Sequence, residues 1–426
     1  MGYSMSIQKY KKIISDLFLM DRNIVSKGNV EALNYIKHHY KDLEIHRFKS
    51  GSEFYDWKVP KSWNLNRASI KNSKGQTILS HESSPMSVVF CSAPIKSNLR
   101  GEDLMERLHT NEFIPEAIPY RQSTYENKWG FCVDQKFKKS ILSEEIYSIE
   151  IDSEFSDGEL LAGELKIIGE SDREIILTSY MCHPRQAHDG LSGVIMLLRL
   201  YDFLSTQNNK FTYRFLMFPE TIGSICLLGS KIIVPDKVEY SLVSTCVGKI
   251  SNLPVYKSTF LNNHSIDNLI NYLFNDSMDI RKYYPFGSDE RQLSSPGIEI
   301  PSAMIMGNSF GEFNEYHTDK DNLEFIDWND FESLFKIYKS TITEYEKYKK
   351  PIYLLSGCEP MLGKRNLYSV IGNSKHTRES IIRNWILHLA NGKNNIMDIS
   401  IKSGFEINLI NQYCEELVNH GIIKLV

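Results

Sequence analysis

Residues 174–193 read EIILTSYMCHPRQAHDGLSG, and this stretch decides the fold class. Its first seven residues form a largely apolar run with the length of a buried strand, and an apolar helix is predicted at Gly190–Leu204. A second buried strand is predicted at Tyr213–Phe218, and a hairpin is expected upstream from Ile149–Ile151 and Leu160–Ile168. Strands that alternate with helices at this spacing predict an α/β sheet covered by helices on both faces.

The loop after the first strand carries two candidate metal ligands, His183 and Asp189. Ligand sites of open α/β sheets collect beyond the carboxyl ends of the strands, where this loop lies. Asp189 alone could equally be the N-cap of the helix that follows. A histidine in the same short loop favours a zinc site, because imidazole and carboxylate groups are typical zinc ligands.

Two later segments carry further polar residues next to apolar runs. Glu220 follows the strand at Tyr213–Phe218 and would be an ordinary solvated residue there, but beside a metal it becomes a candidate general base. His317 lies in the polar segment Glu315-Tyr316-His317-Thr318, and binding residues are often found in such loops. Each element is weak by itself, and their combination indicates a metallohydrolase site.

The order of these motifs resembles that of bacterial zinc aminopeptidases of the leucyl-aminopeptidase type. More closely, the chain from about Phe48 onward is similar to aminopeptidase-like proteins associated with bacterial polysaccharide biosynthesis. The segments that carry this closer resemblance are Phe48–Gly51, Asp56–Pro60, Trp63-Asn64, Leu108–Thr110, Ala117–Tyr120, Trp129–Cys132, Cys182–Pro184, Thr221–Ser224, Gly287–Gln292 and Glu315–Thr318.

The resemblance implies an α/β, zinc aminopeptidase-like (phosphorylase/hydrolase-like) mixed sheet flanked by helices, with a β-rich inserted domain and a C-terminal winged helix. Shifts in composition along the chain fall in the same places. We therefore expect the hydrolase domain at residues 1–47 and 143–365, the inserted domain at residues 48–142, and the winged helix-turn-helix domain at residues 366–426.

The resemblance also implies His183, Asp189 and His317 as metal ligands and Glu220 as the general base. Di-zinc aminopeptidases carry a second glutamate directly after the base, where this chain has Thr221. They also carry an aspartate where this chain has the stretch Thr245–Gly248. Two histidines and one carboxylate remain, which is the ligand set of a single-zinc peptidase, so we expect one zinc ion per chain.

Three neighbouring residues are candidates for substrate binding. Asp289, in the Ser-Asp motif of the resemblance, or Glu290 could hold a free α-amino group, and Arg291 could bind a substrate carboxylate. An internal ion pair between Glu290 and Arg291 is an equally simple interpretation.

These features predict a metallo-aminopeptidase-like enzyme that hydrolyses an amide bond of a peptide or a small amide-containing substrate. One alternative is an amidase or deacylase that acts on an amino sugar or glycan precursor. Another is a non-catalytic module that binds a metal or a partner.

Bulk composition limits the partners. The formal net charge is −4, which gives no electrostatic basis for binding nucleic acid or an anionic membrane. No apolar run reaches the length of a membrane span. The seven cysteines are scattered without a paired pattern, which favours a reducing cytoplasm. A homo-oligomer stays open.

The C-terminal segment has the outline of a winged helix. Helices are predicted at Thr377–Asn391, Met397–Lys402 and Glu406–Asn419, followed by a strand at Ile422–Val426. The third helix has no lysine or arginine and three glutamates, so phosphate groups would repel it. We expect this domain to pack or to bind a partner, and not to read DNA.

Overall fold

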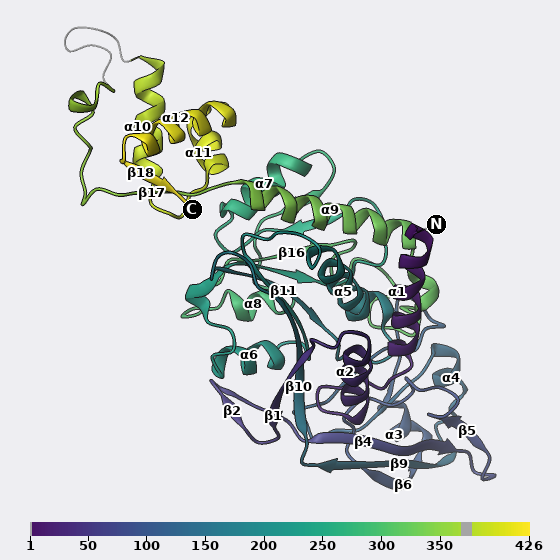
Figure 1. Cartoon of the computed structure of the whole chain (residues 1–426). Helices are drawn as coiled ribbons and strands as arrows, with labels where there is room; N and C mark the ends of the chain where they lie inside the picture. Colours follow the sequence, from purple (N-terminus) through teal and green to yellow (C-terminus); the bar gives the residue numbers. More distant parts are fainter. Residues whose placement is uncertain (1, 368–376) are drawn as a thin grey trace. The chain divides into compact units, whose positions relative to one another are not determined.

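Eight strands of mixed direction form the central sheet of the computed structural model, which describes residues 2–367 and 377–426 (Figure 1). In sheet order these strands are β1 (Glu44–Lys49), β10 (Glu159–Ile167), β12 (Thr212–Phe218), β11 (Glu174–Tyr180), β13 (Val238–Ser244), β16 (Ser302–Met306), β14 (Val255–Lys257) and β15 (Asp279–Arg281). β12, β11, β13 and β16 run parallel to one another, and β1 and β10 pair antiparallel with their neighbours. β14 pairs antiparallel with β16 and parallel with β15.

Helices cover both faces of this sheet, as expected for parallel strands whose residues are buried throughout. On one side lie α6 (Ile222–Gly229) and α8 (Glu290–Leu293), and on the other lie α1 (Gly2–Phe18), α2 (Lys27–His39) and α5 (Ser192–Leu204) (Figure 1). Most residues of α5 are buried, and its apolar sequence matches that position. The α/β sheet predicted from residues 174–193 is confirmed.

A buried ionic network crosses three strands of the sheet. Arg214 on β12 donates to Glu164 on β10 over 2.6 and 3.0 Å and to Glu174 on β11 over 2.9 Å. Burial raises the pKa of Glu164, but hydrogen bonds from His46 and Arg214 outweigh it and lower that pKa to about 2. Each buried charge therefore has a partner, which is the condition for keeping ionised groups in an interior.

A smaller antiparallel sheet forms the β-rich insertion. Its strands, in sheet order, are β5 (Thr77–Ser80), β4 (Ser62–Lys71), β9 (Ile146–Ser156) and β6 (Ile95–Arg100). The expected hairpin of residues 149–151 and 160–168 is wrong. β9 pairs with β4 and β6, whereas β10 pairs with β1 and β12, so the chain changes sheets between two consecutive strands.

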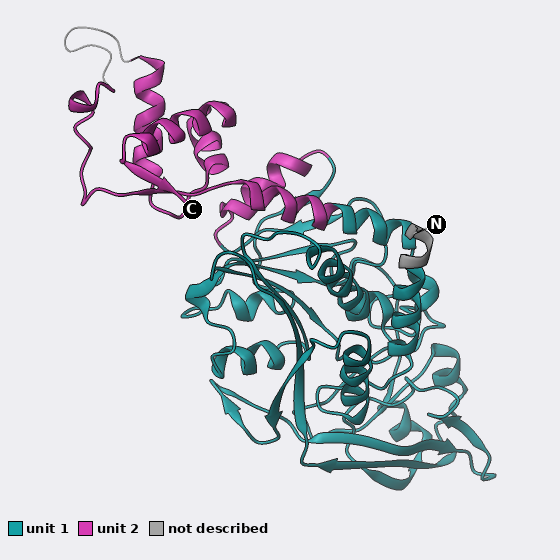
Figure 2. Cartoon of the chain, viewed as in Figure 1, with its two compact units in different colours: residues 1–260, 277–336 teal, residues 261–276, 337–426 magenta. Residues whose placement is uncertain are grey.

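Short elements complete unit 1, one of the two units into which the chain divides, which comprises residues 1–260 and 277–336 (Figure 2). They are β2 (Glu53–Phe54), β3 (Trp57–Lys58), α3 (Gly101–Met105), β7 (Leu108–His109), β8 (Phe131–Cys132) and α4 (Gln135–Ser140). The chain passes into unit 2 within α9 (Trp328–Lys347).

Unit 2 comprises residues 261–276 and 337–426 and contains the winged helix. Its elements are α7 (Ser265–Phe274), β17 (Pro351–Tyr353), α10 (Arg378–Leu389), α11 (Ile396–Ser403), α12 (Ile407–Asn419) and β18 (Ile423–Leu425). Asn395 and Asp398 cap the start of α11, and Gly404 ends that helix in the left-handed conformation. The predicted order of three helices and a strand is confirmed, and β17 adds the second wing strand.

The predicted domain limits remain a prediction. β9 of the insertion's sheet begins only after residue 142, the expected end of the insertion, and β17 precedes residue 366, the expected start of the winged helix.

Candidate metal centre

The loop between β11 and α5 places His183 and Asp189 at the carboxyl end of the sheet. Residues Ala187–Leu191 form a single π-type turn, inside which Gly190 has a φ of 98°. Any other residue at position 190 would have a strained backbone, and its Cβ atom would lie 3.1 Å from the carbonyl oxygen of Tyr180. The glycine therefore lets the chain turn sharply while Asp189 faces back toward the strand end.

The three predicted ligands lie together. One ligand atom each from His183, Asp189 and His317 falls within 4.8 Å of the others. Nε2 of His317 lies 3.0 Å from Oδ2 of Asp189, yet this oxygen accepts no hydrogen bond from any residue that the structure describes. An imidazole nitrogen and a carboxylate oxygen at this separation can share a cation, and the oxygen has no other partner among the described residues. This set of two nitrogens and one oxygen fits zinc.

The protonation states of these groups also suit a cation. Burial lowers the pKa of His183 to about 4, so its imidazole is neutral at physiological pH and its lone pair is available. Burial raises the pKa of Asp189, but the adjacent His183 and His317 outweigh it and hold that pKa below its usual range. The side chain of His317 is 34% exposed, which leaves one side of the centre open to solvent.

Glu220 follows β12 and borders the same centre. Its Oε2 lies 3.8 Å from Nε2 of His183, and its Oε1 accepts a hydrogen bond of 2.6 Å from Ser288. Burial, together with the negative charge of Asp289, raises the pKa of Glu220 to about 8. A carboxylate with a raised pKa next to a cation site suits a group that accepts a proton near neutral pH.

Asp289 holds the turn after Glu220. Its Oδ1 accepts hydrogen bonds from the Thr221 backbone N–H (2.9 Å) and the Ser224 hydroxyl (2.6 Å). Thr221 has a φ of 64°, a strained conformation for a β-branched residue. Burial raises the pKa of Asp289 to about 7. This residue connects directly to the turn that carries the candidate base.

The other two predicted substrate residues lie beside Asp289 on α8. Glu290 is fully buried and accepts hydrogen bonds from Lys257 (2.6 Å) and from the Ser288 backbone N–H (2.9 Å). Arg291 is partly exposed and donates to the carbonyl oxygen of Ser288 over 3.2 Å. The buried ion pair thus joins Glu290 to Lys257, and the substrate roles of Asp289, Glu290 and Arg291 remain predictions.

Asp321 supports the ligand loop, and sequence analysis assigned it no role. Its carboxylate accepts hydrogen bonds from three consecutive backbone N–H groups, those of Ala187 (3.2 Å), His188 (2.6 Å) and Asp189 (2.9 Å). Burial and the charge of Asp189 raise the pKa of Asp321 to about 8. Because Asp321 lies four residues after His317, it ties both ligand segments to one another.

The insertion also reaches the centre. The ring of Tyr120 packs against the rings of both His183 and His317, with centroids 5.2 and 5.3 Å apart. Its backbone N–H donates to the carbonyl oxygen of His317 over 2.7 Å, and Ile118 donates to Asp319 over 2.8 Å. The segment at Ile118–Tyr120, which packs beside His317, therefore comes from about 200 residues earlier in the chain.

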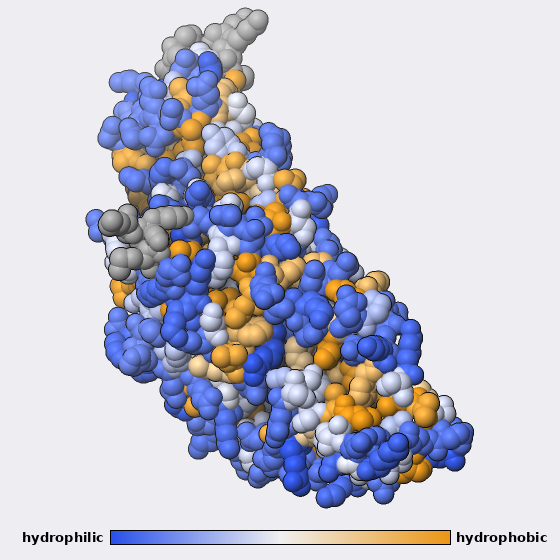
Figure 3. Space-filling model, turned by 90° about the vertical axis from the view of Figure 1, so that its right-hand side faces the viewer, coloured by the Kyte–Doolittle hydropathy of each residue, from blue (hydrophilic) through white to orange (hydrophobic). Residues whose placement is uncertain are grey.

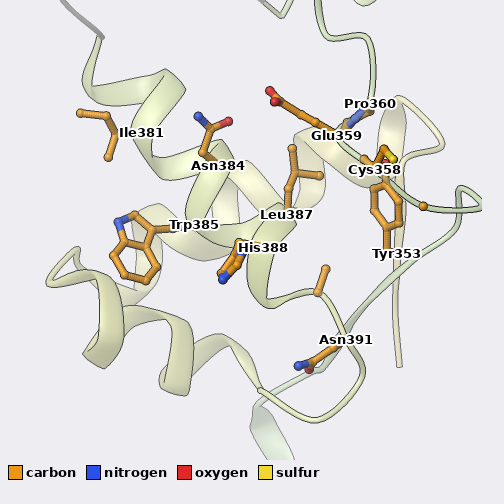
Figure 4. A pocket seen from close by; sticks show the side chains of 12 residues that line it. Tyr353, Cys358, Glu359, Pro360, Ile381, Asn384, Trp385, Leu387, His388 and Asn391 are labelled. Carbon is orange, nitrogen blue, oxygen red and sulfur yellow. Dashed lines mark hydrogen bonds between the residues drawn. The ribbon is translucent and has the colours of Figure 1, made fainter.

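A second candidate cluster and a large pocket lie elsewhere. Glu44, His46 and Glu164 also approach one another, but Arg214 already occupies both oxygens of Glu164. In unit 2, α10 and the segment after β17 enclose a pocket of about 930 Å³ (Figure 4). Its lining includes Tyr353, Cys358, Glu359, Ile381, Trp385 and His388. The pocket holds none of the predicted site residues, so we assign the chemistry to the three-ligand centre.

The chain matches two known family descriptions. Residues 11–348 match the family described as Domain of unknown function (DUF4910). The chain belongs to the DUF4910 family. Residues 351–425 match a winged helix-turn-helix family, which confirms the second part of the expected architecture.

Relatives of this DUF4910 chain have aminopeptidase-like folds. It is 36% identical over 418 residues to a Clostridium acetobutylicum protein named as a candidate polysaccharide biosynthesis protein with an aminopeptidase-like domain, covering 97% of this chain and 95% of the relative. A crystal structure of a candidate peptidase from Clostridium acetobutylicum is 34% identical, with a TM-score of 0.79 over 99% of this chain and 97% of the other.

A more distant structure shows the same fold. The zinc aminopeptidase of Bacillus subtilis is 13% identical and has a TM-score of 0.58 over 79% of this chain and 94% of the other. The expected zinc aminopeptidase-like α/β fold of this DUF4910 chain is thereby confirmed, and its relatives support a peptidase-like hydrolase.

Proposed function

We propose that this chain is a zinc-dependent amide hydrolase of the aminopeptidase type, with His183, Asp189 and His317 as metal ligands and Glu220 as general base. The observation that carries the proposal is the approach of Nε2 of His317 to within 3.0 Å of Oδ2 of Asp189, an oxygen with no other partner among the described residues. A bound zinc ion would supply an acidified water and an electrophile for the substrate carbonyl.

The chain's own side chains would transfer protons and position the ligands. Glu220, next to the centre and held by Ser288, takes a proton and returns it to the leaving amine. Asp321 and Tyr120 both hold the ligand segments in place, the first by hydrogen bonds and the second by ring packing. Asp289 fixes the turn of the base, so a role in holding a substrate amine would have to use its second oxygen, Oδ2, which accepts no hydrogen bond from the described residues.

Removal of His183 is expected to abolish metal binding, whereas removal of His188 is not. His188 is buried, and its Nδ1 accepts a hydrogen bond of 3.0 Å from the Gly248 backbone, with Phe313 and Phe325 packed against its ring. Elemental analysis of the folded fraction should give about one zinc per chain for the wild type and for His188→Ala, and none for His183→Ala. Zinc retained by His183→Ala would contradict the ligand assignment.

The substrate class has a second candidate. The name of the Clostridium acetobutylicum relative refers to polysaccharide biosynthesis, which favours an N-acylated amino sugar as an alternative to a peptide. A panel of aminoacyl anilides, dipeptides and N-acyl amino sugars, assayed with and without a chelator, separates these classes. Absent turnover on the whole panel would favour a non-catalytic metal-binding module, and turnover that a chelator leaves unchanged would contradict the metal-dependent mechanism.

We propose that the winged helix serves packing or partner binding. Glu416 on α12 forms a bidentate ion pair with Arg383 on α10 at 2.7 and 2.9 Å, so a basic residue of this unit is already neutralised. We expect the full chain to show no duplex DNA binding at ~150 mM salt. Fluorescence anisotropy checks this, and tight binding that weakens steeply with added salt would contradict it.

We propose no membrane partner for this chain. On the face shown in Figure 3, hydrophilic residues cover most of the surface, with several groups of apolar residues among them. Within the described residues, no helix has the length and apolar character that crossing a bilayer requires. The proposed partners are a peptide or small amide substrate and, for unit 2, another protein surface or a second copy of the chain.

A further inference from the structure

The two oxygens of the Asp189 carboxylate have different surroundings. Oδ2 faces His317 and accepts no hydrogen bond from the described residues. Oδ1 accepts a hydrogen bond from the hydroxyl of Tyr180 and lies 3.8 Å from the sulfur of Cys246. One oxygen is thus available to a cation, and the other is already engaged by the protein.

The hydroxyl of Tyr180 has only one way to direct its proton. Tyr180 is the last residue of β11, it is buried, and its ring packs against that of His183 with centroids 5.0 Å apart. The hydroxyl of Thr245 donates to the Tyr180 oxygen over 2.8 Å. Because that oxygen accepts from Thr245, its own hydrogen points to Asp189, and the chain Thr245–Tyr180–Asp189 has a fixed direction.

We propose that Tyr180 is a positioning residue that restricts Asp189 to a single metal-binding oxygen. The inference rests on the metal centre proposed above. A carboxylate that binds a cation through both oxygens fills two coordination positions, whereas one held by Tyr180 fills one. The hydrogen bond therefore keeps the centre at three protein donor atoms, which leaves a position for water or substrate.

The test compares the visible spectrum of the cobalt(II)-loaded wild type with that of Tyr180→Phe. Tetrahedral cobalt absorbs visible light strongly, and absorption weakens when a fifth ligand atom enters. We expect strong absorption for the wild type and clearly weaker absorption for Tyr180→Phe, because Oδ1 is then free to join the metal. Isothermal titration calorimetry with cobalt(II) gives the number of ions bound per chain for the same variants.

Two further variants control for packing. Tyr240→Phe removes a hydroxyl from another buried tyrosine, on β13. Tyr240 pairs with Ile175, five residues before Tyr180 on β11, and the spectrum of this variant should equal that of the wild type. Thr245→Val leaves both Tyr180 and Asp189 in place but removes the donor that directs the Tyr180 proton. It should shift the spectrum in the same direction by a smaller amount, and it keeps the test decisive if Tyr180→Phe does not fold.

The outcomes separate this inference from the proposed function. A weaker spectrum, or a second bound cobalt in Tyr180→Phe, supports the control of Asp189 by Tyr180. Identical spectra and stoichiometry in the wild type and both site variants overturn it and leave the metal centre intact. A wild-type chain that binds no cobalt overturns the metal centre as well.

Discussion

Glu220→Gln is expected to keep its metal and to lose about 10²–10⁴-fold in kcat, the usual contribution of a general base. Glutamine has nearly the same shape and can still accept the hydrogen bond from Ser288, but its amide cannot take up a proton. The measurement is steady-state hydrolysis of the best substrate from the panel, combined with elemental analysis of the same preparation.

Two results would change the role of Glu220. Loss of zinc together with activity would make it a ligand, and full activity would move proton transfer to another group, with Asp289 next in position. A matched control is Glu159→Gln on β10, where a partly exposed glutamate pairs with Arg47 at 2.9 Å. Its kcat should equal that of the wild type, because a surface ion pair contributes little.

Asp321→Ala is expected to lower the free energy of unfolding by about 3–5 kcal/mol. The substitution leaves the buried N–H groups of His188 and Asp189 without their acceptor, whereas that of Ala187 keeps the backbone carbonyl oxygen of Asp321 at 3.1 Å. Each unsatisfied group costs roughly 1–3 kcal/mol. Water that enters the space offsets part of the sum. Urea denaturation in the presence of a chelator measures the effect without the contribution of bound metal.

The control for this loss is Asp236→Ala, at an exposed position before β13. A surface change of this kind should stay within about 0.5 kcal/mol. If Asp321→Ala were equally mild, the three hydrogen bonds would be replaceable by water, and Asp321 would have no structural role at the ligand loop.

The parts of the site that follow strand ends could be predicted from sequence. Residues 174–180 and Tyr213–Phe218 have the apolar character of buried strands, and the structure places strands there. His183 and Glu220 each follow one of these strands by two or three residues, so parallel pairing of the two strands brings them close. Local pattern and sheet geometry together therefore suffice to place them.

The groups that hold the ligands in place could not be predicted in this way. Tyr180 reads as one more residue of an apolar strand, and only the structure shows its hydroxyl on Asp189. Asp321 gave a faint signal as an aspartate four residues after His317, but its three hydrogen bonds depend on tertiary folding. The hairpin at residues 149–168 was expected because strands that are consecutive in sequence usually pair. Here the first strand belongs to the inserted sheet and the second to the central sheet, so the two do not pair.

The contact of Tyr120 and Ile118 with the segment at His317 has a consequence for synthesis of the protein. Chains emerge from the ribosome with the N-terminus first, and domains generally fold as they emerge. The first histidine and the aspartate of the centre emerge well before His317, and Pro119 of the insertion can form its isolated β-bridge only once Thr318 has been made. An incomplete chain accordingly carries no finished centre, and hydrolysis can begin only after most of the polypeptide has been made.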